Sequence, residues 1–231
     1  MKQVIKSSAT ALVQSASRYG CKAAFLTTIG LAGLTTANAQ IQFPVGLPAP
    51  KVGDIAKYRT VDLWNGSELS TTSNEIIELT SDNITIRNTS STRPAPTTVK
   101  YTREWQACRS MKGSDAVVCA GALKFPLQSG NKHAYEKAPW LTGEGHTTAN
   151  CEVKAEEKVT VPGGTFDTVR TECSGFWNRV FNGSSSGRVT EAYWYAPSIH
   201  RVVKVQYADT LSSGQSNTKT QTELTEFTAG K

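Results

Sequence analysis

The sequence predicts an all-β protein whose antiparallel strands form hairpin meanders, either as one curved sheet or as two half-repeats that share a core. Short runs rich in β-branched and aromatic residues recur along the chain, which is typical of strands. Turn signals separate these runs, among them Asn65-Gly66 and the VPGG segment at 161–164. No amphipathic pattern after residue 39 predicts a helix, and short turns between consecutive strands imply antiparallel pairing.

Residues 1–39 predict a secretory signal peptide. The segment holds four cations and no acid, an apolar stretch at 23–34, and an Ala-Asn-Ala cleavage motif at 37–39. The apolar stretch is too short to cross a bilayer and leads directly into the cleavage motif. We therefore expect an exported protein that does not span a membrane. It would be cleaved between Ala39 and Gln40 and would be periplasmic or secreted.

The charge of the remaining chain argues against nucleic acid as a partner. Residues 1–39 hold four of the 25 Lys and Arg residues and none of the 19 acids, so residues 40–231 carry a net charge of +2. Nucleic-acid binding calls for clustered cations with interleaved aromatic residues, whereas these cations are scattered among acids. We expect no nucleic-acid partner.

Four cysteines follow the signal segment, and an even number in an exported chain indicates two disulfides. Four cysteines allow three connectivities. Sequential pairing is favoured, because a two-residue turn at Gly113-Ser114 would place the first two opposite each other and the VPGG hairpin lies between the last two. The predicted bonds are Cys108–Cys119 and Cys151–Cys173. No C-x-x-C spacing supports a metal or redox site at these thiols.

The expected strands lie in order between turns and would form a single domain over residues 40–231. One stretch, 124–150, has no clear strand pattern and is expected to be a long loop, either a lid or a mobile segment. In that stretch Trp140 could cover a ligand groove or plug the open edge of the sheet. A similar order of proline, glycine and tyrosine at 50–58 and at 126–135 suggests half-repeats at 50–122 and 123–231. The expected strands are 54–64, 68–79, 84–90, 99–108, 117–125, 151–161, 165–173, 187–196, 200–208 and 218–227.

Four blocks, at 53–66, 125–132, 159–170 and 193–207, carry a resemblance to a known family. They resemble an uncharacterised family of bacterial periplasmic proteins with V-P-A-G-T-F and Y-W-Y-[AS]-P-x-[IV]-x-R-V-V-K blocks. The resemblance implies an antiparallel sheet similar to the lipoprotein carriers LolA and LolB, and it implies no activity. Here Gly163 replaces the usual alanine, His133 stands where tryptophan is frequent, and the four cysteines are not part of the family pattern.

Candidates for catalysis are weak. Ser198 and His200 lie in a proline turn and Asp209 follows, but ordinary turns prefer such residues. His133 and His146 lack metal-ligand spacing. We expect no catalytic residues, no metal and no cofactor.

The segment Glu191–Tyr207, EAYWYAPSIHRVVKVQY, predicts a hairpin that turns at 197–200. Strand alternation with Ala196 opposite Arg201 gives one apolar face with Trp194 opposite Val203. It gives a second face with Tyr193 opposite Lys204. Any ligand here would meet this second face. The candidate ligand contacts are Tyr193, Tyr195, Lys204 and Trp140.

Three functions fit these features. The first is a non-catalytic envelope protein that binds a lipid or other hydrophobic or amphipathic molecule on a curved sheet, which rests on fold analogy. The second is a structural or docking component that contacts another envelope protein, and the third is a hydrolase with an unrecognised site. A concave face lined by apolar side chains would favour binding, whereas a filled core with an exposed flat edge would favour docking.

Overall fold

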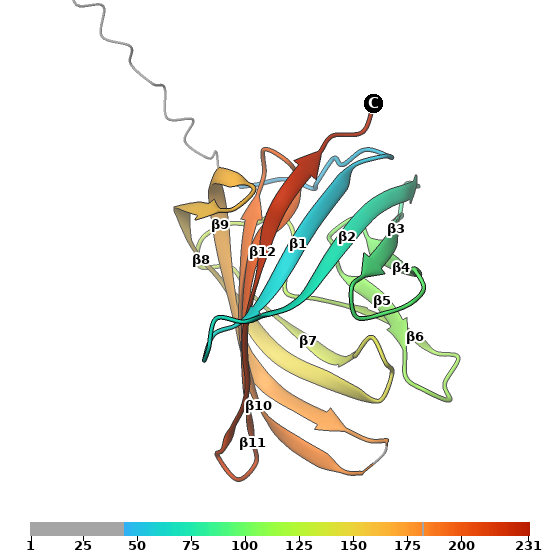
Figure 1. Cartoon of the computed structure of the whole chain (residues 1–231), viewed down its shortest axis with the longest axis vertical. Helices are drawn as coiled ribbons and strands as arrows, with labels where there is room; N and C mark the ends of the chain where they lie inside the picture. The colour runs from blue at the N-terminus through green and yellow to red at the C-terminus, as the bar shows by residue number, and fades with distance from the viewer. Residues whose placement is uncertain (1–43, 182) are drawn as a thin grey trace, which may run out of the picture. The chain divides into compact units, whose positions relative to one another are not determined.

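A computed structural model describes residues 44–181 and 183–231, which form one antiparallel sheet of twelve strands without a helix (Figure 1). The predicted all-β fold is therefore confirmed. The predicted signal peptide and its cleavage site lie outside the described residues. The strands are β1 (Ile55–Asp62), β2 (Glu68–Leu79), β3 (Asn83–Ser90), β4 (Thr97–Thr102), β5 (Ala107–Ser110), β6 (Val117–Ala120), β7 (Lys132–Pro139), β8 (Gly145–Val161), β9 (Gly164–Arg179), β10 (Ser185–Ala196), β11 (Arg201–Leu211) and β12 (Ser216–Thr228). In this part of the chain no helix is long and apolar enough to cross a membrane.

The sheet joins two meanders through the first and last strands. Its order is β6-β5-β4-β3-β2-β1-β12-β11-β10-β9-β8-β7, so β1 and β12 pair in the middle. Their register runs from Ile55 opposite Thr228 to Asp62 opposite Thr220. The two edge strands, β6 and β7, follow each other in sequence and lie in contact. The chain thus brings both edges of one sheet together without a ladder between them.

Curvature comes from irregular pairing. Register shifts interrupt seven of the eleven strand pairings, and such bulges bend a strand and increase its twist. Figure 1 shows the resulting strongly curved sheet, with the N-terminal strands turned over the C-terminal hairpins. One side of the sheet is therefore concave and encloses space.

Apolar side chains on both sides of β10 are buried. On the concave side Tyr195 and Val169 pack with Phe125 and Leu127 from the segment that joins β6 to β7. On the other side Trp194 belongs to a second cluster with Val159 and Val161, next to the β8–β9 turn. That turn is tied to β12, since the Gly163 amide donates to the Leu224 carbonyl at 2.9 Å. Burial on both faces fixes the position of β10 and the side chains it presents.

Both predicted disulfides are confirmed, because Cys108 lies opposite Cys119 and Cys151 lies opposite Cys173 in their ladders. The predicted two-residue turn at Gly113-Ser114 is wrong. The connection spans residues 111–116, and the Ser114 amide donates to the Met111 carbonyl. A tight type I′ turn needs positive φ at both central residues, whereas only Gly113 has it here (77°).

The hairpin at Asn65-Gly66 also has a longer loop, residues 63–67, than a two-residue turn. Gly66 has a positive φ of 74° and its amide donates to the Asp62 carbonyl. Asn65 does not have the positive φ that a two-residue type I′ turn requires. The glycine therefore marks the hairpin without setting its loop length.

The expected long loop at 124–150 is wrong, since it contains β7 and the start of β8. The strand is hard to recognise because a register shift between Tyr135 and Ala138 breaks its alternation, and Lys137 has a φ of 48°. It ends at Pro139, a residue that edge strands tolerate. The charged, irregular character of this segment is that of a protected sheet edge.

Removal of the Cys151–Cys173 disulfide is expected to destabilise the protein more than removal of Cys108–Cys119. Replacing Cys151 and Cys173 by alanine should lower the free energy of unfolding by about 3 kcal/mol, since the bond closes 22 residues. Both sulfurs are also buried, so packing is lost in addition. Urea denaturation should show a smaller loss for Cys108 and Cys119, which are less buried and close 11 residues. A larger loss at Cys108–Cys119 would contradict this ranking.

Candidate ligand-binding site

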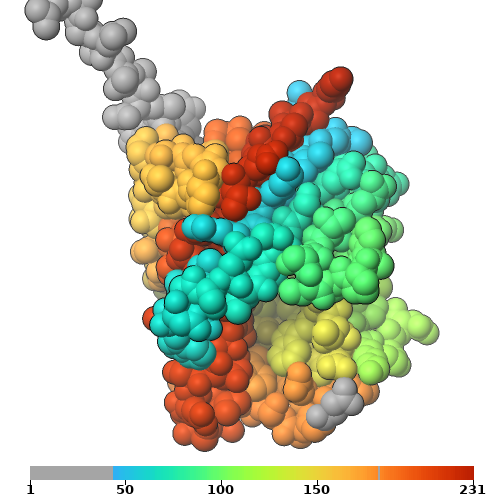
Figure 2. All heavy atoms as spheres, viewed as in Figure 1, coloured from blue at the N-terminus to red at the C-terminus, as the bar shows by residue number. Residues whose placement is uncertain are grey.

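The concave side of the sheet contains a cavity of about 420 Å³. Every strand except β9 contributes to its wall, so the cavity exists only because the meander curls upon itself. Figure 2 shows the face on which the N-terminal strands lie above β7 and β10. Small side chains such as Ala107 and Ala138 keep the cavity open, and aromatic rings surround it. The aromatic residues of the wall are Tyr58, Tyr101, Trp105, Tyr135, Trp140 and Tyr193.

Trp105 is placed by a tight turn after β4. The Trp105 amide donates to the Thr102 carbonyl at 3.0 Å, and the Thr102 amide donates to the Gln106 carbonyl at 2.9 Å. This turn gives Trp105 a φ of 62°, a conformation that costs a bulky residue on the order of 1 kcal/mol. The ring stacks edge-on with Tyr101 at 5.9 Å between centroids. A strained aromatic residue that faces a cavity marks a candidate functional position.

One end of the cavity is cationic. Arg201 is only 4% exposed, and its guanidinium carbon lies 4.5 Å above the centre of the Trp105 ring. Its Nη2 lies 3.7 Å from Oδ2 of the equally buried Asp54, which is an ion pair without a hydrogen bond. The oxygens of Asp54 already accept the Lys51 and Gly230 amides, at 2.9 and 2.8 Å. Burial lowers the pKa of Arg201, although a guanidinium stays charged at neutral pH.

The other polar group of the wall is a carboxyl held by two phenols. Tyr135 donates its hydroxyl to Glu191 at 2.9 Å, and Tyr193 also bonds this carboxyl. Burial raises the pKa of Glu191, and the two hydrogen bonds act in the opposite direction. Burial, together with the charge of Glu191, also raises the pKa of both Tyr135 and Tyr193. Both tyrosines therefore remain neutral donors at physiological pH.

Two of the four predicted ligand contacts, Tyr193 and Trp140, line the cavity. Tyr195 does not, since it is fully buried against the Phe125 ring at 5.2 Å between centroids. Lys204 lies on the opposite face, where its Nζ is 4.7 Å from the centre of the Trp194 ring. The structure thus separates these residues between a cavity wall, a core and the outer face.

The predicted pairing of this hairpin is correct at its turn and wrong beyond it. Ala196 lies opposite Arg201 as expected. A bulge at Val203 then shifts the register, so Trp194 pairs with Lys204 instead of Val203. Tyr193 consequently pairs with Val205 and not with Lys204. One extra residue in a strand moves every later side chain to the other face, which alternation alone does not reveal.

Residues that sequence reasoning missed make up the charged part of the wall: Arg201, Arg109 and Glu191, with Trp105 in the same wall. Strand alternation puts Arg201 on the face expected to be core. A cation on such a face is the signal that could have identified it. Nothing in the local pattern pointed to Arg109 or Trp105. Their site depends on contacts between the N-terminal and C-terminal strands.

The candidate catalytic residues are not brought together. Ser198 and His200 occupy the turn before β11, whereas Asp209 lies opposite Val189 near the far end of that strand. The Asp209 carboxylate accepts hydrogen bonds from Tyr207 and Asn217. Within residues 44–181 and 183–231 no histidine ring bonds a serine or threonine hydroxyl, and no group of acids, histidines and cysteines could hold a metal. The expectation that the protein is not an enzyme stays a prediction.

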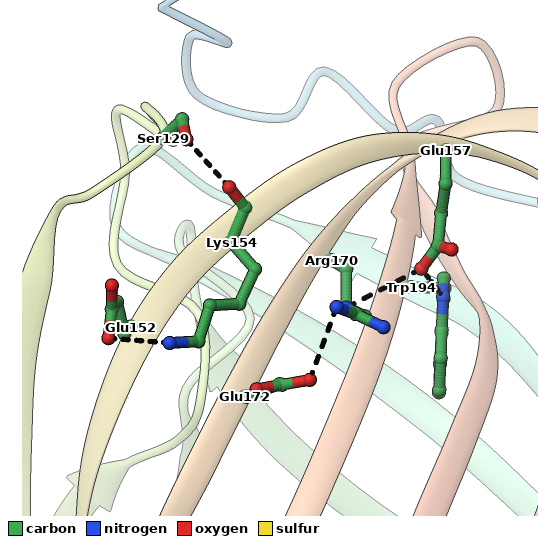
Figure 3. A network of polar contacts seen from close by, with 7 residues as sticks. All are labelled: Ser129, Glu152, Lys154, Glu157, Arg170, Glu172 and Trp194. Carbon is green, nitrogen blue, oxygen red and sulfur yellow. Dashed lines mark hydrogen bonds and ion pairs between the residues drawn. The ribbon is translucent and has the colours of Figure 1, made fainter.

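The outer face carries a network of paired charges (Figure 3). Lys154 contacts Glu152 at 2.7 Å, and Arg170 lies between Glu157 at 3.5 Å and Glu172 at 3.4 Å. Glu157 also accepts a hydrogen bond from the Trp194 ring nitrogen. A groove of about 850 Å³ runs along this face. Several of its charged residues, Lys132, Glu152, Lys154 and Glu172, already form ion pairs, so we place the candidate site in the aromatic inner cavity.

Comparisons with known proteins do not assign the chain to a family. No protein-family model and no curated protein matches it. A candidate exported protein with a YmcC-like fold from Bacteroides fragilis is 11% identical, with a TM-score of 0.49. A candidate lipoprotein from Parabacteroides distasonis is 15% identical, with a TM-score of 0.48. Each alignment covers 80% of this chain and 99% of the other. The family resemblance and the similarity to LolA and LolB stay predictions.

The buried carboxyl predicts a pH dependence of stability. A carboxyl whose pKa rises on folding binds more protons in the native state, so stability falls as pH rises above its ordinary value of 4.5. Glu191→Gln should therefore reduce the fall in melting temperature between about pH 4.5 and 7. Calorimetry of both proteins across this range measures the effect. An unchanged slope would show that Glu191 does not titrate there.

Proposed function

We propose that this chain is an exported, non-catalytic envelope protein that binds a hydrophobic or amphipathic molecule in the inner cavity. The observation that carries this proposal is the cavity of about 420 Å³ with its wall of six aromatic residues. Small-molecule pockets range over roughly 300–1,000 Å³ and are mostly apolar with a few placed polar groups. The cavity matches both criteria.

The physical case rests on what an apolar ligand would gain. Each Å² of apolar surface removed from water contributes about 25 cal/mol, so a chain enclosed by these rings gains free energy over its whole length. Alanines at 107, 120, 122 and 138 keep the space open, since larger side chains there would fill it. The sheet is a rigid scaffold for such a site because both faces of β10 are packed.

Two further features support an extracytoplasmic role. The two disulfides fit an oxidising compartment, in which such bonds form and persist. The predicted signal peptide at 1–39 would deliver the chain there. Placement in the periplasm or outside the cell is part of the proposal.

A docking role has weaker support. An open edge would offer unpaired backbone groups to another protein. Here β6 and β7 lie against each other and the sheet encloses a cavity, which favours a small-molecule ligand over strand addition. The hydrolase alternative gains no support from the positions of its candidate residues.

Filling the cavity should weaken binding without unfolding the protein. Ala107→Phe places a ring in the inner space and is expected to weaken binding of 1-decanol at least tenfold, which corresponds to about 1.4 kcal/mol. Isothermal titration calorimetry measures this affinity. The matched control is Ala208→Phe, which adds the same ring beside the outer groove and should leave the affinity unchanged.

Native mass spectrometry of protein purified from its own envelope fraction gives a second readout. A copurifying amphiphile in the unaltered protein, lost in Ala107→Phe and kept in Ala208→Phe, is the expected result. If nothing copurifies with the unaltered protein and 1-decanol does not raise its melting temperature, the proposed function is wrong. Equal binding to both variants would place the ligand outside the cavity.

A further inference from the structure

Arg201 combines deep burial with unused hydrogen-bonding capacity. Its Nε, Nη1 and Nη2 atoms are all buried, and none has a hydrogen-bond partner in the described part of the chain. Buried charged groups ordinarily form hydrogen bonds, because an unsatisfied one costs free energy. Each exception calls for an explanation, and a ligand that completes the hydrogen bonds is one.

The contacts of Arg201 leave its donors available. The guanidinium lies over the Trp105 ring at 4.5 Å, so this contact uses the face of the group and not its N–H edge. The single ion pair, with Asp54, is 3.7 Å long and involves only Nη2. Glu191, the other acid of the wall, bonds Tyr135 and Tyr193 and forms no ion pair with Arg201 among residues 44–181 and 183–231. Asp54 is thus the counter-charge of Arg201, but the N–H donors of the guanidinium have no hydrogen-bond partner within these residues.

Other unpaired donors line the same cavity or lie close to Arg201. The ring nitrogen of Trp105 and Nε of Arg109 are buried without hydrogen-bond partners in the described residues, and both side chains line the cavity. The Tyr195 hydroxyl is likewise buried and unpaired, close enough to Arg201 to affect its pKa. An anion could accept hydrogen bonds from several such donors at once.

We infer that the molecule in the inner cavity carries an acidic head group, a carboxylate or a phosphate, which binds Arg201 while its apolar tail lies along the aromatic wall. This inference rests on the proposed function and adds the ligand class. A guanidinium presents a planar fork of N–H donors that matches two oxygens of either anion. The Trp105 ring, which lies against the guanidinium, supplies a further unpaired donor through its nitrogen. The tail then lies among Tyr58, Tyr101 and Trp140.

The head group of the ligand then decides its affinity. A carboxylate that enters an apolar cavity without a cation loses its hydration and binds worse than an alcohol of the same length. A charge-assisted, two-point contact with Arg201 reverses this order. Decanoate is therefore expected to bind the unaltered protein at least tenfold more tightly than 1-decanol, and decyltrimethylammonium more weakly than both.

The experiment compares decanoate, decyl phosphate, 1-decanol, decyltrimethylammonium and inorganic phosphate by calorimetry on the unaltered protein, Arg201→Gln and Arg188→Gln. Arg201→Gln should remove the advantage of the two anionic amphiphiles and leave 1-decanol within about twofold. The matched control is Arg188, which also lies over a ring, that of Phe176 at 5.5 Å, but is exposed. Arg188→Gln should retain the full preference.

The outcomes separate the two proposals. If 1-decanol binds and the anionic amphiphiles bind no more tightly, the head-group inference is wrong while the proposed function stands. If none of the decyl compounds binds, both fail. Inorganic phosphate that binds as tightly as decyl phosphate would make a small free anion the ligand and overturn the role of the tail. The head-group series on the unaltered protein decides the question even where Arg201→Gln does not fold.

Discussion

The pairing of β1 with β12 is the constraint on which the rest of the structure depends. Without it the chain would be two separate meanders, each with a concave surface but no enclosed space. The ladder from Ile55–Thr228 to Asp62–Thr220 joins them into one sheet. It also places Asp54, just before β1, beside Arg201 at the start of β11. Residues just before β1 and just after β12 therefore hold the charged end of the cavity.

Side chains from distant segments converge on Arg201 for this reason. Tyr58 of β1 donates its hydroxyl to the Val202 carbonyl at 3.0 Å, which ties β1 to β11 within the cavity wall. Trp105, from the turn after β4, covers the guanidinium. The Gly230 amide holds Asp54 near the end of the chain. Disturbing the β1–β12 ladder would thus loosen the cation and the aromatic wall at the same time.

The fold could be predicted to the level of local pairing, because alternation and turn residues act over a few neighbours. The two disulfides followed from hairpins whose turns contain glycine, and both pairs lie opposite each other. Strand β7 could not be predicted, since a bulge and Lys137 with positive φ remove its alternation. The bulge at Val203 likewise moved Lys204 away from Tyr193. Irregularities of one residue decide which face a side chain occupies.

The site itself was only half predictable. Tyr193 and Trp140 could be chosen because aromatic residues with a polar group suit ligand contacts, and both line the cavity. Arg201, Arg109 and Glu191 could not be assigned to it, because their roles arise from strands that meet only after the sheet closes. A buried cation with unused donors is visible only in three dimensions.

The most direct test of this account is a crystal structure of the protein with decanoate bound. The account predicts the carboxylate within hydrogen-bonding distance of the Arg201 guanidinium, with the alkyl chain along Tyr58, Tyr101 and Trp140 inside the cavity. Decanoate in the outer groove, or in the cavity with its carboxylate turned away from Arg201, would contradict it.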